Sequence, residues 1–295
     1  MHMAVSLRKQ IAQNKRNTVF TMVLFVALIT VIGAIIAWAN NNWIILVWFL
    51  IVTLSYVGVQ FLISDIVALV CCGARRAKRD EYQRLYKAAE KLAEPAKIPM
   101  PRLYIIKDPA PNAFTVGRNP SRACIAVTTG LLDVMDDKEL RAIIAHEMMH
   151  IKNYDILTST VTFGLVSIAG IIADFGLRTL LYSDRDEEDN SPIGMLFVLI
   201  VLTLSPVLAP VVRFTISRHR EYQADVASAG LIGDANEISN ALRQLEMHKQ
   251  PMRQQNFATE ALFITNPLKK SIVSDIYSTH PPIELRIERL ENAKK

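Results

Sequence analysis

Residues 141–156 read RAIIAHEMMHIKNYDI, and this stretch decides the fold of the region around it. It contains His146, Glu147 and His150 in the pattern H-E-x-x-H. On an α-helix, residues four apart lie about 40° apart around the axis, so both imidazoles face the same way and can bind one metal ion. Glu147 flanks them and can take a proton from water on that metal. The pattern predicts two metal ligands and a general base on one helix.

The residues before the motif favour a helix. Asp136 and Glu139 have the spacing of a capping box, in which each side chain satisfies a backbone N–H of the first turn. Apolar residues then recur at helical spacing, at Leu140, Ile143, Ile144 and Met148. The alternative is a core helix whose histidines are merely hydrogen-bonded, and a third ligand elsewhere in the chain decides between the two.

A third ligand must come from elsewhere in the chain, because a catalytic zinc takes three protein ligands and one water molecule. The candidates are His219, Glu221, Asp225, His248 and His280. Glu221 and Asp225 lie four apart on one helical face, whereas His219 points about 160° away from Glu221. We expect Glu221 to complete a site for one zinc ion per chain, with Asp225 orienting a ligand histidine. The alternative is that these carboxylates belong to a solvated helix face.

The composition indicates a membrane protein. The chain has 295 residues, of which 51% are hydrophobic, and its mean hydropathy is +0.22. Four segments are long and apolar enough to cross a bilayer, at about 18–38, 43–70, 156–182 and 193–212. The third is interrupted by Asp174 and Arg178, which lie four apart and could pair with each other.

Charge placement predicts the orientation of these spans. Basic residues cluster at 8–16, before the first span, at 75–79, after the second, and at 213–220, after the fourth. Positive charge stays on the cytoplasmic side, so we expect a multi-pass protein of the cell (inner or plasma) membrane with its N-terminus and metal site in the cytoplasm. The basic clusters are interpreted as topology signals and contacts with the lipid bilayer, not as a nucleic-acid site.

The three cysteines are consistent with a cytoplasmic metal site. Cys71 and Cys72 are adjacent, and Cys124 lies in a strand-like run, so the chain offers no disulfide framework typical of secreted proteins. We interpret all three as thiols in a reducing compartment.

The chain therefore divides into four regions. Residues 1–70 form an N-terminal tail and a transmembrane hairpin, and residues 71–155 a cytosolic part with the metal helix. Residues 156–212 form a second hairpin, and residues 213–295 a cytosolic helical part with the third ligand. The expected fold class is a mostly α membrane protein with four transmembrane helices and a cytosolic α+β domain.

The cytosolic part before the metal helix predicts one helix and a small sheet. Residues 80–94 are amphipathic and are followed by Pro95, which should end the helix. Strand-like runs follow at 102–107, 112–117 and 123–129, separated by Pro, Asn and Gly. We expect these runs to form a small antiparallel sheet.

Four segments of this sequence resemble a known family. They are PNAFTVGRNP (111–120), AHEMMHIKNYD (145–155), EYQAD (221–225) and THPPIELRIERL (279–290). Their order around two transmembrane hairpins is similar to that of the HtpX family of membrane-bound zinc endopeptidases, over nearly the whole chain. Met149 departs from the family, which has a small residue there, and implies altered packing because it lies between ligands.

The resemblance implies a gluzincin-type site. His146, His150 and Glu221 would hold zinc, Glu147 would be the general base, and Asp225 would steady one histidine. Asn112, Ala113 and Phe114 resemble the start of an edge strand along which an extended polypeptide substrate pairs. The family's activity is quality control of misfolded or damaged membrane proteins, often linked to stress.

The transition-state oxyanion needs a donor besides the metal. His280, Tyr222 and Arg218 are the candidates, and His280 is preferred. The alternative role for His280 is capping of the helix that follows it.

Other functions remain open from the sequence. The prenyl (CAAX) protease relatives share H-E-x-x-H but have more spans and a large enclosed chamber. A non-catalytic metal-binding membrane protein, such as an ion carrier, would need polar residues lining several spans. An interaction module on a membrane anchor would not need the metal residues.

Overall fold

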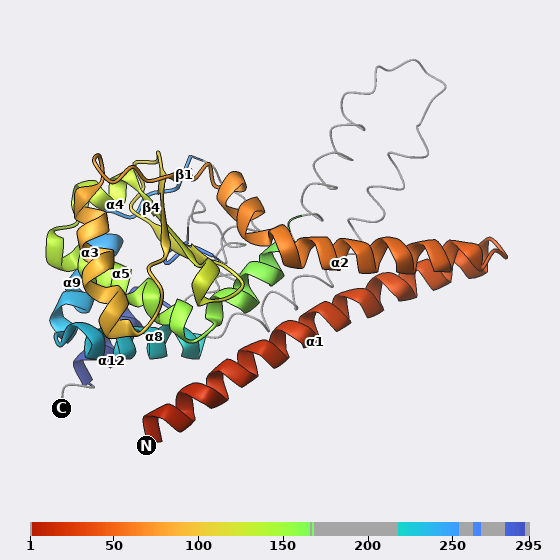
Figure 1. The fold of residues 1–295 in the computed structure, drawn as a ribbon, viewed down its shortest axis with the longest axis horizontal. Helices are drawn as coiled ribbons and strands as arrows, with labels where there is room; N and C mark the ends of the chain where they lie inside the picture. Colours follow the sequence, from red (N-terminus) through yellow and green to blue (C-terminus); the bar gives the residue numbers. More distant parts are fainter. Residues whose placement is uncertain (1, 166, 168–217, 254–261, 267–280, 293–295) are drawn as a thin grey trace, which may run out of the picture.

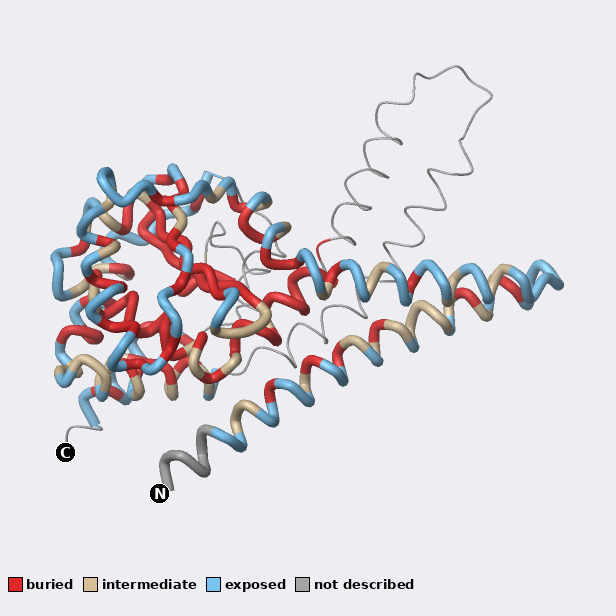
Figure 2. Tube along the Cα trace, in the orientation of Figure 1, coloured by how far each residue is buried: buried red, intermediate tan, exposed pale blue. Residues whose placement is uncertain are grey.

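A computed structural model describes residues 2–165, 167, 218–253, 262–266 and 281–292. Two long helices, α1 (His2–Ala39) and α2 (Ile44–Cys71), pack against each other as a hairpin that projects from a globular part (Figure 1). Residues 8–39 and 44–71 are long and apolar enough to cross a membrane. Along the projecting part, Figure 2 shows α2 mostly exposed and α1 alternating between exposed, intermediate and buried residues, whereas the interior of the globular part is buried.

The first two predicted spans are therefore helices of the expected kind. The fourth span and most of the third lie outside the described residues, so a total of four spans stays a prediction. The described part of the third span, residues 156–165 and 167, is helical. Helix α1 begins well before its predicted span, so its basic N-terminal part extends as a helix beside the globular part (Figure 1).

The sheet has four strands: β1 (Arg75–Arg76), β2 (Arg102–Ile106), β3 (Ala113–Val116) and β4 (Cys124–Thr128). Their order is β1-β2-β4-β3, so β3 lies at an edge. The β1–β2 and β3–β4 pairs are antiparallel, but β2 and β4 run parallel. The expectation of an antiparallel sheet is therefore wrong. After β2 the chain crosses to the outer edge to form β3, and β4 returns between the two, in the direction of β2.

Among the described residues, the globular part also contains seven helical elements besides the helix that begins at Asp155. They are α3 (Gln83–Ala96), the 3₁₀ turn η1 (Pro120–Arg122), α4 (Thr129–Val134), α5 (Asp137–Lys152), α8 (Arg218–Ile232), α9 (Ala235–Met247) and α12 (Ile283–Asn292). Helix α3 extends past the predicted stop, with Pro95 inside its last turn, and ends where Lys97 takes a positive φ of 58°.

Helix α5 is the centre of the globular part and packs against α3, α8, α9 and β3. The predicted capping box is present, because the Asp136 carboxylate accepts from the backbone N–H of Glu139 and the Glu139 side chain accepts from that of Asp136. The apolar residues at helical spacing, Leu140, Ile143, Ile144 and Met148, are buried in the core. Buried apolar packing on several sides makes α5 a rigid base for the motif it carries.

Helix α5 does not continue into the next helix without a break. The chain turns at Asn153 and Tyr154, where Tyr154 has a φ of 61°, and a new helix starts at Asp155. This turn brings the Asp155 side chain back beside the end of α5.

Candidate metal centre

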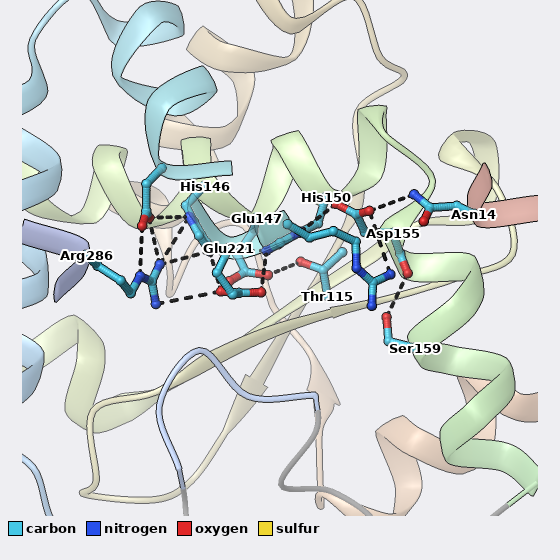
Figure 3. Close-up of polar contacts among 11 residues, drawn as sticks. Asn14, Thr115, His146, Glu147, His150, Asp155, Ser159, Glu221 and Arg286 are labelled. Carbon is cyan, nitrogen blue, oxygen red and sulfur yellow. Dashed lines mark hydrogen bonds and ion pairs between the residues drawn. The ribbon is translucent and has the colours of Figure 1, made fainter. Parts of the chain in front are cut away.

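His146, His150 and Glu221 converge on one point (Figure 3). The Nε2 atoms of the two histidines are 3.1 Å apart. Each lies 3.6 Å from an oxygen of Glu221. A tetrahedral ion with bonds of about 2.0–2.1 Å holds its ligand atoms roughly 3.3 Å apart. The three donors therefore already have the spacing that a zinc ion needs, and two imidazoles with one carboxylate form a donor set that zinc accepts.

Two of the other histidines considered as a third ligand, His219 and His248, lie elsewhere. His219 is exposed on α8 and hydrogen-bonds to Gln223 at 2.9 Å. His248 is exposed at the C-terminal end of α9, where its ring contacts the Gln244 carbonyl oxygen. Glu221, from α8, is the residue that the fold places against α5.

A carboxylate holds each ligand imidazole at its second nitrogen. Asp225 lies 3.0 Å from Nδ1 of His146, and Asp155 lies 3.0 Å from Nδ1 of His150. A carboxylate at Nδ1 favours the tautomer that carries its proton there, which leaves the Nε2 lone pair for a metal. Asp225 thus lies where the sequence predicts it, while Asp155 was not anticipated.

Arg286 closes the site from α12. Its side chain is fully buried and forms a two-pronged contact with Asp225, with N–O distances of 2.8 and 2.7 Å. Its Nη1 lies 3.7 Å from Glu221. Planar pairing of this kind fixes a carboxylate in orientation as well as in charge. The C-terminal helix therefore helps to set the position of His146.

Burial and charge act in opposite directions on these groups. Burial lowers the pKa of His146, but hydrogen bonds that its imidazole donates to Asp225 and Glu221 outweigh it and raise that pKa to about 9. Burial raises the pKa of Asp225, but the adjacent Arg286 outweighs it and lowers that pKa to about 2. The surroundings of the imidazoles thus favour a positive charge between them.

The ionised side chains around the imidazoles have an excess of negative charge. The carboxylates are Glu147, Asp155, Glu221 and Asp225, and the guanidinium groups are Arg220 and Arg286. With neutral histidines this leaves two uncompensated negative charges, which one divalent cation would balance. The residues therefore fit the zinc ion that the donor set suggests.

Glu147 lines a pocket beside the three donors and accepts a hydrogen bond from a residue of the sheet. Thr115, on the edge strand β3, donates a hydrogen bond to a Glu147 oxygen (Figure 3). The pocket is lined by Thr115, His146, Glu147, His150, Asp155, Ile156, Ser159, Arg220, Glu221, Leu262 and Ile264. A carboxylate next to an open coordination position is the arrangement that a general base requires.

The three residues expected to bind substrate lie on β3 or next to it and contact the chain's own segment 262–266. Asn112 exchanges hydrogen bonds with Thr265, and the Ala113 carbonyl accepts from the Ile264 N–H at 2.9 Å. Phe114 packs edge-on against Phe263. These contacts hold the segment that supplies part of the pocket wall, and direct substrate binding stays a prediction.

Two of the three expected oxyanion donors, Arg218 and Tyr222, do not line the pocket. His280 lies outside the described residues. Arg218 is exposed, and the Tyr222 ring lies under the Arg289 guanidinium at 3.8 Å. Neither lines the pocket, whereas Arg220 does.

Three residues with a role in this geometry escaped the sequence analysis: Thr115, Asp155 and Arg286. Asp155 ends the quoted 145–155 segment, five residues after His150. Arg286 falls on the apolar stripe of its helix, between Ile283 and Leu290, where a charged residue needs a buried partner. An arginine on the buried side of an amphipathic helix was the available signal.

The chain is similar to known proteases. The model of peptidase family M48 matches residues 79–294. A protease HtpX homolog of Tropheryma whipplei (strain Twist) is 39% identical over 282 residues, covering 95% of this chain and 96% of the relative. One from Streptococcus pyogenes serotype M28 is 40% identical over 297 residues, covering 97% and 99%.

A likeness to a solved structure extends over most of the fold. The crystal structure of S. mikatae Ste24p matches with a TM-score of 0.50 and 18% identity, covering 93% of this chain and 66% of that one. At this identity the likeness shows the fold alone.

Proposed function

We propose a function for this chain from the premise that it belongs to peptidase family M48 and, within it, to the HtpX proteases. With its apolar helices and its His–His–Glu group, the chain is a membrane metalloprotease. Our proposal is more specific: a zinc-dependent endopeptidase that cleaves misfolded or damaged membrane proteins on the cytosolic side. The observation that carries it is the placement of Glu147 beside three donors at zinc spacing, facing a pocket.

The proposed chemistry assigns a separate task to each group. His146, His150 and Glu221 would hold the ion, which would supply a Lewis acid that acidifies water and polarises a peptide carbonyl. Glu147 takes a proton from the attacking water and delivers it to the amine nitrogen of the leaving peptide. Thr115 keeps the Glu147 carboxylate turned toward the pocket while these transfers occur.

The substrate is proposed to be an extended polypeptide. The walls beside the donors include Ile156, Leu262 and Ile264, which offer an apolar surface to a substrate side chain. Asn112 and Ala113 support this wall through the 262–266 segment. Unfolded and membrane-derived chains present apolar side chains on extended backbone, as such a surface requires.

Location and orientation follow from the charges. The basic residues of α1 and those at 75–79 flank the hairpin on the side of the globular part. We propose that this side is the cytoplasm, because positive charge is retained there. The protein is then a multi-pass protein of the cell membrane, with its active site close to the inner surface.

The test compares the wild type with Glu147→Gln, as full chains in detergent. The amide keeps the size of the side chain but cannot accept the proton, so cleavage of unfolded casein should fall by at least about 100-fold. Zinc content, measured by mass spectrometry, should stay at one ion per chain. Glu221→Ala is the matched control, which should lose zinc and cleavage together. Normal cleavage by Glu147→Gln would contradict the proposed base.

A further inference from the structure

We propose that Asn14, on the membrane helix α1, is a positioning residue for the metal centre and acts through Asp155 on His150. The inference rests on the proposed function, because it assigns a support to a ligand of the same site. Asn14 precedes the first predicted span and is distant in sequence from every ligand. Its side chain nevertheless reaches the centre (Figure 3).

The contact is a short chain of hydrogen bonds. The Asn14 amide donates to Asp155 Oδ1 at 2.7 Å, and the other oxygen of that carboxylate lies 3.0 Å from Nδ1 of His150. Asn14 and Asp155 are both buried, so water does not readily replace either bond. One oxygen of Asp155 is thus held by α1 while the other holds the ligand.

Asn14 also fixes the turn that presents Asp155. Its amide nitrogen donates to the Asn153 carbonyl oxygen at 2.9 Å, at the end of α5. An amide has two N–H donors, so the residue can make both bonds at once. One side chain therefore secures both the backbone turn after α5 and the carboxylate beyond it.

A neighbouring contact offers a matched control. Thr18, one turn further along α1, lies 3.1 Å from the Thr158 hydroxyl and is also buried. It belongs to the same helix–helix contact and also donates to the Asn14 backbone carbonyl oxygen at 2.9 Å, but no bond from it reaches the Asn14 side-chain amide or Asp155. Loss of the Thr18 hydroxyl removes a bond to the Asn14 backbone and weakens the packing of α1, but it leaves both donors of the Asn14 side-chain amide in place.

The geometry makes the membrane anchor a component of the active site. Helix α1 is continuous from Asn14 into the apolar segment that ends at Ala39. A displacement of α1 would release one side of Asp155 and loosen His150. Polar groups that orient ligands typically change metal affinity by about 10- to 100-fold when removed.

The experiment measures zinc affinity of the full chain by competition with a chromophoric chelator, and the visible spectrum of the cobalt-substituted protein. The variants are Asn14→Ala, Asn14→Asp, Thr18→Val, Asp155→Ala and the Asn14→Ala/Asp155→Ala double variant. Asp155→Ala should weaken zinc about 10-fold or more, and Asn14→Ala about three- to tenfold. Asn14→Asp places a second carboxylate against Asp155 and should weaken zinc as well, while Thr18→Val should match the wild type.

The double variant distinguishes a specific role from general loosening. If Asn14 acts through Asp155, the double variant should bind zinc no more weakly than Asp155→Ala alone. The cobalt spectrum of Asn14→Ala should differ from that of the wild type, whereas that of Thr18→Val should not. Melting temperatures separate folded variants from unfolded ones, and Asn14→Asp serves if Asn14→Ala does not fold.

Two results would overturn the inference. One is wild-type zinc affinity in a folded Asn14 variant, and the other is additive losses in the double variant. Failure of the proposed function would give a different result from failure of this inference. The zinc-loaded wild type would then not cleave casein, or Glu147→Gln would cleave it normally.

Discussion

At the scale of single residues, the two ligand histidines are held in the same way from opposite sides. His146 is held by Asp225, and Arg286 on α12 holds Asp225. His150 is held by Asp155, which accepts a hydrogen bond from α1. Each imidazole is therefore oriented by a carboxylate that a distant element fixes, an arrangement that preserves ligand geometry when the centre binds or loses its ion.

Arg286→Ala should destabilise the protein strongly, because it leaves the buried Asp225 carboxylate without its partner. Removal of one member of a buried ion pair costs about 3–5 kcal/mol. Denaturant unfolding of the full chain in detergent measures this cost. The control is Arg289→Ala on the same helix, which removes an exposed cation–π contact worth about 0.5–1 kcal/mol. Equal unfolding curves for the two variants would contradict the role of Arg286.

Thr115→Val should slow catalysis without removing the metal. The valine has the same shape but cannot donate to Glu147, so kcat should fall by about 10-fold, while zinc content and KM change little. Thr115→Ser keeps the hydroxyl and should restore most of the rate. Steady-state cleavage of a fluorogenic peptide checks both variants, and a normal kcat in Thr115→Val would dismiss the contact as incidental.

At the scale of elements, helix α5 depends on its N-terminal cap. Asp136 accepts from the backbone N–H groups of Lys138 and Glu139, both at 2.8 Å. Asp136→Ala should lower the free energy of unfolding by about 1 kcal/mol, and Lys138→Ala should leave it nearly unchanged. Thermal unfolding followed by circular dichroism makes the comparison. Identical melting temperatures for the two variants would show that the cap contributes nothing.

Much of the site is predictable from local spacing. A helix repeats every 3.6 residues, so the pattern at His146 and His150 already implies two ligands on one face, and Asp136 with Glu139 implies where that helix begins. Glu221 is predictable for the same reason, because its distance from Asp225 is one helical turn.

The remainder depends on contacts between elements that spacing does not encode. Asp155 reaches His150 because α5 ends in a turn at Asn153 and Tyr154, where Tyr154 takes a positive φ, and a new helix begins at Asp155. Arg286 and Thr115 enter from a helix and a strand that are remote in sequence. The parallel pairing of β2 with β4 likewise depends on the position of β3, which lies at the outer edge of the sheet and pairs antiparallel to β4. The strand-like runs alone are compatible with either direction of pairing.

At the scale of the whole molecule, the proposed metal site draws on elements from distant parts of the chain. The ligands come from α5 and α8, and their supports from α12 and α1. Removal of the ion with a chelator should therefore lower the melting temperature of the full chain, and added zinc should restore it. At zinc 100 times above its Kd the expected stabilisation is about 2.7 kcal/mol. His146→Ala, as the control, should show no response to the chelator, and an equal response in both proteins would contradict this connection.

The most direct test is a zinc-edge anomalous difference map from crystals of the full chain. One peak is expected, about 2.0–2.2 Å from Nε2 of His146, Nε2 of His150 and an oxygen of Glu221. A zinc-loaded crystal with its peak away from these three side chains, or with Glu221 turned away from the ion, would contradict the proposed catalytic centre.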